Sequence, residues 1–336
     1  MNHNEGFSKE TMRQIYLCNC THINEWVNQF LNDMSNVKQF EELPYHYIIP
    51  SYEKVSGLIT GKIYHYTSAD ALINILKSGG GKKFFTLRLS RVDYMNDIYD
   101  GKDVFEFIFD ECIKSEQIKL SSNFKQYVTD LVKSLQEGQF NEASSREVSY
   151  ISSLTIDGDS LPMWRNYTNN GGGYNIVFDP SSLWDYCNMD SKMALIPVVY
   201  NYDLMVKIIN AILTTFSLIW ENDQERITDL KLLLFRYIML SKLSFKHPSF
   251  SHEQEIRIIK IEPRIFGINQ NEKYAVSNGI MRPYIDVEFP KDIFLGVTVG
   301  PLLEADAAKL TVENVIAANG GWGSDKVNIS AAPIRF

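Results

Sequence analysis

The stretch Glu255-Ile256-Arg257-Ile258-Ile259-Lys260-Ile261 decides the fold class. Four of its seven residues are isoleucine, and branched side chains of this kind pack well on the pleated surface of a sheet. A short apolar run rich in β-branched residues is typical of a buried strand. We therefore predict a central β-strand here and read the chain outward from it.

The segments around this strand alternate irregularly between strand and helix patterns. Further strands are predicted at residues 61–68, 84–90, 148–154, 174–178, 193–200, 284–289, 293–299 and 327–335. Helices are predicted at residues 69–76, 103–114, 124–137, 204–220, 226–243 and 305–318. The polar and aromatic segment 157–173 is predicted to be a loop. This order favours an α+β fold with a mixed or split, antiparallel-rich sheet and flanking helices over a doubly wound nucleotide-binding fold.

The first 58 residues are predicted to form a helical extension. Ile15, Ile23, Trp26 and Leu31 approximate one stripe of a helix. The segment 44–50 contains tyrosines and prolines and favours an irregular connection. The predicted organisation is therefore an N-terminal helical extension at 1–58 and a main domain at 59–336.

The composition is that of an ordinary globular chain. Of the 336 residues, 45% are hydrophobic and 22% are charged. The longest apolar stretches, near 208–220 and 230–240, are interrupted or flanked by polar and charged side chains, so we predict no membrane-spanning helix and no membrane partner. Residues 1–10 lack the pattern of a signal peptide. These features favour a cytoplasmic location.

The net charge and the cysteine content indicate which partners and metal sites to expect. The net charge of −8 argues against broad binding along nucleic acid, which depends on neutralising phosphates, although a local basic groove at 82–91 stays open. The cysteines are interpreted as reduced thiols, because they lack the spacing of a zinc site: Cys18, Cys20, Cys112 and Cys187. His247, His252 and Glu253 fit no helix face, and we predict no metal site.

The first candidate site motif is Tyr64-His65-Tyr66-Thr67-Ser68, where a strand ends and a helix begins. Free N–H groups at a helix N-terminus suit an anion such as a pyrophosphate. The imidazole of His65 is a candidate partner for a ribose hydroxyl. The alternative is a buried His65 satisfied by the backbone, with Thr67 and Ser68 as helix caps.

Two further motifs place polar and aromatic groups near predicted strand ends. Ser90 and Arg91 precede Asn96, and the guanidinium could pair with a phosphate; the alternative is a plain turn.

Trp164, Arg165 and Tyr167 come before the glycine run 171–173 and Tyr174. This arrangement suits stacking on a planar ring and close approach of backbone to a ligand. The alternative there is Trp164 as a core residue.

The fourth motif is Glu253-Gln254-Glu255-Ile256-Arg257. On an extended segment, residues two apart share a face, so the two carboxylates would face the same way and one would hold its proton at higher pH. Glu255 opens an apolar strand, where a charge is costly without a partner. Arg257 is that partner in the alternative interpretation, a structural Glu255–Arg257 ion pair.

These motifs together resemble a widespread bacterial family catalogued as a domain of unknown function. The matching pieces are 64–68, 88–90, 95–97, 159–167, 245–247 and 253–257, and the resemblance covers roughly 60–336. That family is in turn similar to the ADP-ribosyltransferase superfamily with its His–Tyr–Glu layout. The resemblance implies Glu255 as the catalytic carboxylate and Glu253 as the other member of a two-glutamate motif. The second motif is not a clean Ser-Thr-Ser strand, so the stacking residue, Tyr174 or Tyr167, stays open.

By this resemblance the protein would use NAD as its substrate. The implied NAD-binding set is His65, Tyr66, Thr67, Ser90, Arg91, Asn96, Trp164, Arg165, Tyr167 and Tyr174. Arg91 or Arg165 would hold the pyrophosphate. Cleavage of the nicotinamide–ribose bond passes through an oxocarbenium-like state, which a carboxylate bound to the ribose 2′-hydroxyl would stabilise.

The function implied by the superfamily is transfer of ADP-ribose to a protein or nucleic-acid acceptor, in a toxin or phage-defence effector. Two alternatives stay open: a non-catalytic module that senses or binds a nucleotide, and an NAD hydrolase with water as acceptor. The sequence does not indicate the acceptor, the oligomeric state or the role of the N-terminal extension.

Overall fold

The structure is a computed structural model in which the chain divides into two compact units. It describes residues 28, 31–39, 61–77, 83–95, 98–114, 118–136, 147–190, 192–263, 269–277, 279–319 and 326–333. We call 51–95, 147–195 and 252–336 the sheet unit, and 1–50, 96–146 and 196–251 the helical unit. Each is described by itself.

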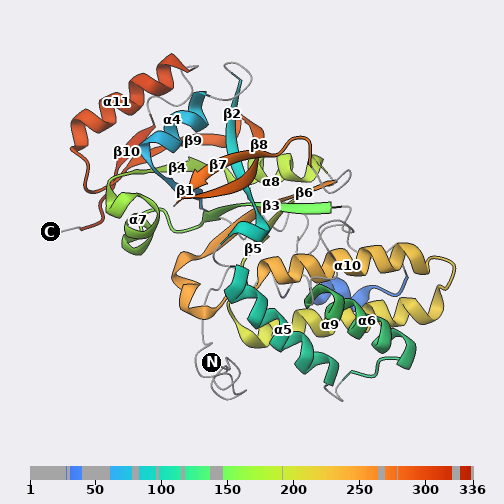
Figure 1. The fold of residues 1–336 in the computed structure, drawn as a ribbon. Helices are drawn as coiled ribbons and strands as arrows, with labels where there is room; N and C mark the ends of the chain where they lie inside the picture. The colour runs from blue at the N-terminus through green and yellow to red at the C-terminus, as the bar shows by residue number, and fades with distance from the viewer. Residues whose placement is uncertain are drawn as a thin grey trace. The chain divides into compact units, whose positions relative to one another are not determined.

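The sheet unit contains a ten-stranded, mostly antiparallel sheet (Figure 1). Its main path runs β10(Val327–Ile329), β9(Phe294–Val299), β4(Tyr174–Phe178), β1(Ile63–Thr67), β3(Glu147–Thr155), β2(Phe84–Arg91), β8(Ile280–Pro290) and β7(Lys273–Ser277). β6(Glu255–Pro263) pairs with β3 and with β5(Met193–Pro197). Only β9 and β10 are parallel among the pairs whose register is given. The predicted α+β class with a mixed, antiparallel-rich sheet is confirmed.

The sheet is split along β3. β6 pairs with the whole length of β3, from Glu147 to Thr155. β1 meets β3 only at Thr155, through Tyr64, and β2 meets it further along, at Tyr150 and Ile151. Two groups of strands, β1-β4-β9-β10 and β2-β8-β7, therefore leave β3 at different positions, one at its last residue and the other near its middle.

The sheet is accompanied by α4(Ala69–Lys77), α7(Leu161–Tyr167), α8(Pro180–Met189) and α11(Ala305–Ala318). The prediction of a loop throughout 157–173 is wrong, because α7 occupies the centre of that segment. Neither α8 nor β7 was predicted. α8 did carry a signal, since Asp179 caps it by accepting from the Ser182 N–H and Pro180 stands in its first turn.

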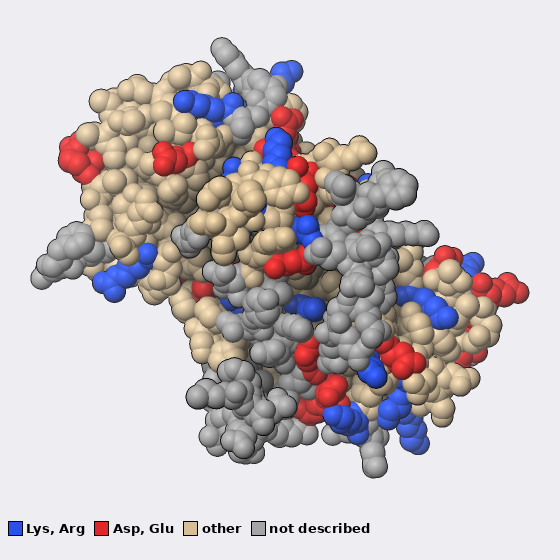
Figure 2. Space-filling model, viewed as in Figure 1, with Lys and Arg blue, Asp and Glu red and all other residues tan. Residues whose placement is uncertain are grey.

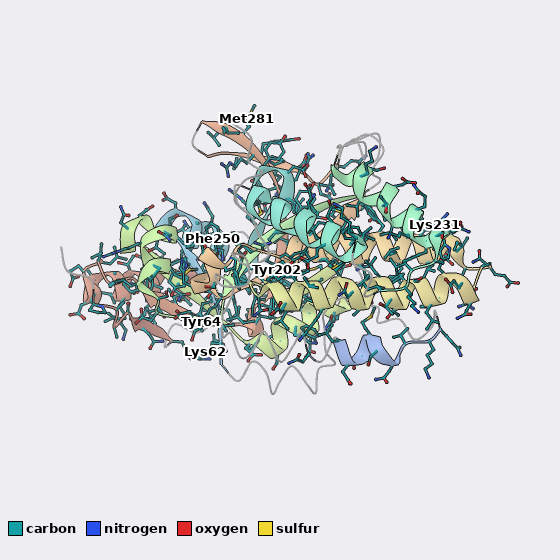
Figure 3. All side chains as sticks on the ribbon, turned by 90° about the horizontal axis from the view of Figure 1, so that it is seen from below. Lys62, Tyr64, Tyr202, Lys231, Phe250 and Met281 are labelled. Carbon is teal, nitrogen blue, oxygen red and sulfur yellow. The ribbon has the colours of Figure 1, made fainter. Side chains whose placement is uncertain are left out.

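The helical unit is built from α5(Ile98–Lys114), α6(Ser122–Gln136), α9(Tyr202–Asn222) and α10(Ile227–Ser244). An aromatic cluster joins three of these helices: Trp220 of α9 packs on Tyr127 of α6, and Lys231 of α10 lies over both rings. Lys231 is labelled in Figure 3. Of the predicted N-terminal extension, only residues 28 and 31–39 are described, and 31–36 are helical. The Met34 carbonyl accepts a hydrogen bond from Thr215 of α9, so this segment belongs to the helical unit.

One helix, α9, is long and apolar enough to cross a membrane by length and composition. Its most apolar window is 56% buried inside the protein. A core helix of this length passes the same test, and the burial of Ile208, Ile212 and Phe216 identifies α9 as one.

The glycine run 171–173 packs against the chain itself. Gly300 donates its N–H to the Gly173 carbonyl at 2.8 Å. A side chain added at Gly300 would place Cβ 2.5 Å from the Gly171 oxygen and 2.6 Å from the Gly173 oxygen. These glycines therefore allow two backbone segments to approach each other closely, and the predicted approach of the run to a ligand stays a prediction.

Replacing Gly300 by alanine is expected to destabilise the protein by about 1–3 kcal/mol, because two backbone oxygens would have to move. Gly61→Ala is the matched control, since nothing lies within 4 Å of its added Cβ. Urea unfolding of both variants checks the prediction. Equal stability of the two variants would contradict the close packing described here.

Candidate functional site

His65 lies where the ladder between β1 and β3 ends. Its Nδ1 is 3.1 Å from the Ser153 carbonyl oxygen of β3. A carbonyl only accepts, so Nδ1 carries the proton and Nε2 is the acceptor nitrogen of a neutral ring. Burial lowers the pKa of His65, and the hydrogen bond to Ser153 opposes this only in part. The imidazole is therefore a neutral group set into the split of the sheet.

This lowered pKa gives a pH dependence with a defined sign. The folded state favours the neutral ring, so its contribution to stability is complete above the unfolded pKa, about 6.5, and is lost as the pH falls below that value. We expect the free energy of unfolding to decrease between about pH 7.5 and 5.5, and His65→Gln to reduce this decrease. Urea unfolding at both pH values measures it; the same slope in both proteins would contradict the assignment.

The late carboxylates lie at the same end of the sheet as His65. Glu255, the first residue of β6, pairs with Thr155 of β3, and Thr155 pairs with Tyr64 of β1. Three strands thus bring Tyr64, Thr155 and Glu255 into one row. Neighbouring strands lie about 4.8 Å apart, so β1 and β6 are separated by about 10 Å here.

Both carboxylates are buried and held by partners. Glu255 is 3% exposed and Arg257 is 5% exposed. The Arg257 guanidinium binds the Glu255 carboxylate through two hydrogen bonds: Nε donates to Oε1 at 2.8 Å and Nη2 donates to Oε2 at 3.0 Å. The Glu255–Arg257 ion pair of the alternative interpretation is present, and the catalytic role of Glu255 stays a prediction. Glu253, 4% exposed, accepts from the Tyr167 hydroxyl at 2.7 Å.

The backbone between the two glutamates is not extended. Gln254 has a φ of +42°, a left-handed conformation that is uncommon for residues other than glycine, asparagine and aspartate. The prediction that an extended segment puts both carboxylates on one face is therefore wrong. Two bonds hold this kink against the end of β3: Thr155 Oγ1 donates to the Glu253 carbonyl at 2.6 Å, and the Ile156 N–H donates to the Gln254 carbonyl at 3.3 Å.

Tyr66 of β1 and Trp164 of α7 form an aromatic contact between the strand and the helix. Their ring centroids are 4.8 Å apart and nearly perpendicular. Trp164 is 0% exposed, and its Nε1–H donates to Asp159 at 2.7 Å. The Tyr66 hydroxyl donates to the Asp157 carbonyl and accepts from the Ser160 N–H. Trp164 is thus a core residue, as the alternative interpretation had it, and Tyr66 fixes the loop before α7.

Four further residues of the predicted NAD-binding set lie either on the paired strands β1 and β4 or on helix α7. Thr67 is buried and pairs with the half-buried Tyr174 of β4, next to His65. Tyr167 is 43% exposed, and its hydroxyl binds Glu253. Of the two candidate stacking residues, it is therefore Tyr167 that contacts a candidate catalytic carboxylate. Arg165 is exposed on α7.

Ser90 and Arg91 do not join this group. They pair with Ile151 and Tyr150 of β3, and Tyr150 is five residues, about 17 Å, from the Thr155 row. Arg91 is bound there to Asp93 at 2.8 Å and to Glu272 at 3.5 Å. Arg91 therefore lies in a separate ion-pair cluster. Asn96 lies outside the described residues.

Asn175 belongs to the candidate site but was not predicted. It pairs with Tyr66, is 0% exposed, and donates from Nδ2 to the Gly158 carbonyl at 2.7 Å. Its Oδ1 has no hydrogen-bond partner among the described residues. The sequence did carry a signal for Asn175, because burying an amide within the apolar strand Tyr174–Phe178 costs free energy unless the amide is hydrogen-bonded.

Over the described part of the chain, no group of three or more His, Cys, Asp or Glu side chains could hold a metal. Cys187 is buried, which raises the pKa of its thiol to about 12. On the face drawn in Figure 2, acidic and basic side chains are interspersed, and the described residues form no continuous basic area there.

Comparison with known proteins identifies one family match. A model described as a protein of unknown function, DUF2971, matches residues 163–258. The segment runs from α7 to β6 and contains Tyr167, Glu253 and Glu255, so the predicted resemblance to an uncharacterised domain family is confirmed over this part. No curated protein and no solved structure matches the chain. Nothing in the comparisons links it to ADP-ribosyltransferases.

Proposed function

We propose that the protein binds NAD and transfers its ADP-ribose to a macromolecular acceptor, a protein or a nucleic acid. One observation carries the proposal: β1, which carries the neutral imidazole of His65, and β6, which begins at the buried Glu255, flank the same end of β3 with their backbones about 10 Å apart. The chain brings them together from positions 65 and 253–255.

In this proposal each group has a distinct task. Nε2 of His65, an acceptor in the neutral ring, receives a hydrogen bond from a ribose hydroxyl. Glu255, which Arg257 orients through both carboxylate oxygens, accepts from the 2′-hydroxyl and stabilises positive charge on the ribose.

Tyr167 is the preferred stacking residue in this proposal. Its ring is exposed while its hydroxyl is fixed on Glu253, which suits a planar nicotinamide placed beside the carboxylates. The left-handed Gln254 between the two glutamates supports the same site. Such backbone strain costs about 1–3 kcal/mol and concentrates at functional sites.

A second candidate function is a non-catalytic nucleotide-binding module. The observation that favours it is the engagement of both carboxylates, Glu253 by Tyr167 and Glu255 by Arg257. A structural ion pair of this kind would hold β6 in place without taking part in chemistry. NAD binding without turnover is the result that distinguishes this function.

Incubation with cell extract and NAD labelled in the adenylate phosphate tests the proposal. Label on a protein or nucleic acid supports ADP-ribosyl transfer, and would fit a toxin or phage-defence effector acting in the cytoplasm. Label released only as free ADP-ribose indicates an NAD hydrolase. Unchanged NAD that nevertheless binds to the protein indicates the non-catalytic module.

A further inference from the structure

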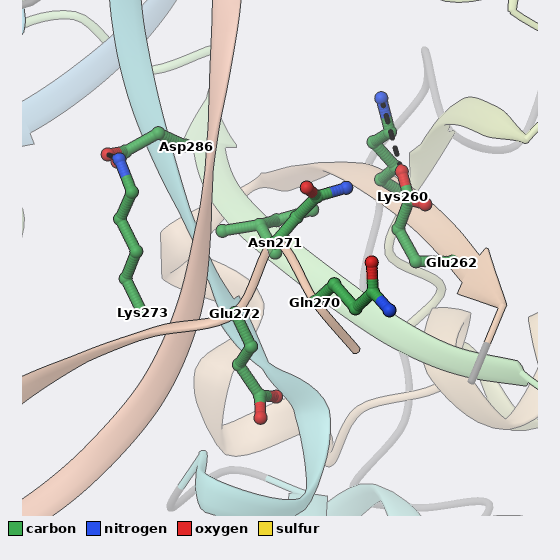
Figure 4. A pocket seen from close by; sticks show the side chains of 8 residues that line it. Lys260, Glu262, Gln270, Asn271, Glu272, Lys273 and Asp286 are labelled. Carbon is green, nitrogen blue, oxygen red and sulfur yellow. Dashed lines mark hydrogen bonds and ion pairs between the residues drawn. The ribbon is translucent and has the colours of Figure 1, made fainter. Parts of the chain in front are cut away.

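A cavity of about 380 Å³ lies in the sheet unit (Figure 4). It is away from the proposed NAD site. Lys260 and Glu262 of β6 line one side, and the turn that carries Gln270, Asn271 and Glu272 lines another. Lys260 is five residues from Glu255 on β6, about 17 Å along the strand. The volume falls within the range of small-molecule sites, about 300–1,000 Å³.

The turn that lines this cavity is held in one conformation. The Asn271 N–H donates to Asn269 Oδ1 at 2.9 Å, and Asn269 Nδ2 donates to the Tyr150 hydroxyl at 3.0 Å. The Glu272 carboxylate accepts from Tyr150 at 2.8 Å and from Tyr274 at 3.0 Å. Polar groups fixed in this way bind a ligand at a smaller entropic cost.

The charges around the cavity are paired. Lys260 lies 3.3 Å from Asp190 and 3.4 Å from Glu262. Lys273 lies 2.9 Å from Asp286. Because each ammonium already has a carboxylate partner and the acids outnumber the lysines, a phosphate would meet net repulsion. The site does not suit an anion.

Several hydrogen-bonding groups around the cavity have no partner in the described part of the chain. Among the described residues, the side-chain amides of Gln270 and Asn271 have no hydrogen-bond partner, and neither has Oε2 of Glu262 or Oδ1 of Asp286. These groups include both donors and acceptors. A hydroxyl both donates and accepts, whereas a ligand ammonium only donates.

We propose that this cavity binds a neutral sugar, a pentose or hexose ring whose neighbouring hydroxyls bond to the amides and carboxylates that line it. Ile285 supplies the apolar contact within the lining, and the hydroxyl of Tyr274 fixes the lining carboxylate of Glu272. Apart from Ile285, every lining side chain is polar or charged, as a polyhydroxyl ligand requires. This site goes beyond the proposed NAD chemistry.

Saturation-transfer NMR on the full chain, with D-ribose and D-glucose as probes, tests the proposal. We expect transfer to at least one neutral sugar at millimolar concentration, and at least about tenfold weaker binding in Asn271→Ala and Glu262→Gln, because hydrogen bonds to the sugar are lost. Lys309→Ala, on exposed α11, and His65→Ala, at the proposed NAD site, should bind as the parent does.

Three results would overturn it: no transfer to either sugar, binding that Asn271→Ala leaves unchanged, or stronger binding of ribose 5-phosphate or spermidine. Circular dichroism of each variant establishes that it is folded. Because no NAD is present, a negative outcome leaves the NAD proposal untouched. Loss of binding in His65→Ala alone would instead place the sugar in the proposed NAD site.

Discussion

Replacing Glu255 by glutamine is expected to lower the rate of nicotinamide release from NAD by about 10²–10³-fold. The substitution removes the negative charge that would stabilise the oxocarbenium-like state, while the side chain keeps almost the same shape. NAD affinity should change much less, since His65 and Tyr167 are untouched. Single-turnover nicotinamide release and equilibrium NAD binding measure the two quantities separately.

The buried partner of Glu255 makes a stability control essential. Glutamine presents an amide N–H₂ to Arg257, which is itself a donor, so part of any lost activity could reflect local disorder. Glu262→Gln, later on the same strand and half-buried, is the matched control and should keep full activity. A Glu255→Gln protein that is folded, binds NAD and still turns it over at the parent rate would contradict the catalytic role.

Removing Arg257 alone is expected to destabilise the protein by about 3–5 kcal/mol, because it leaves the Glu255 carboxylate buried without its partner. Both oxygens of that carboxylate are held by this one guanidinium. Arg257→Ala should therefore unfold at clearly lower urea concentration than the parent.

The double variant Glu255→Leu/Arg257→Met separates charge from packing. Replacing a buried ion pair by apolar residues of similar size is often neutral or stabilising, so this variant should recover most of the stability lost in Arg257→Ala. Urea unfolding of the parent, both single variants and the double variant completes the cycle. A double variant as unstable as Arg257→Ala would show that the pair contributes through other contacts.

The fold class was predictable because the strongest strands carry their signal locally. The isoleucines of β6 and the apolar runs of β1, β2 and β4 mark strands whatever their neighbours. The short helix α7 was missed because its seven residues contain Pro162 and lie in a polar segment, and what stabilises it is the burial of Trp164 and Met163 in tertiary contacts. β7 was missed because it lies at the edge of the sheet, with Tyr274 and Val276 exposed.

The candidate site was predictable in its residues and less so in its geometry. His65 and Glu255 stood out as polar groups at the ends of apolar strands. The placement of their strands on either side of β3 depends on which strands pair, and the pairing between residues 64, 155 and 255 is set by long-range packing. For the same reason, the sequence did not show that Arg91 pairs near the middle of β3, away from the Thr155 row.

The NMR signal of the His65 side chain on addition of NAD is the most direct test of the central claim. The chain has six histidines, so the imidazole ¹⁵N resonances can be assigned by single substitutions. The account predicts that NAD shifts the Nε2 resonance of His65 while the ring stays neutral, and that His247 shifts much less. Saturating NAD that leaves His65 unchanged would contradict a binding site in the split of the sheet.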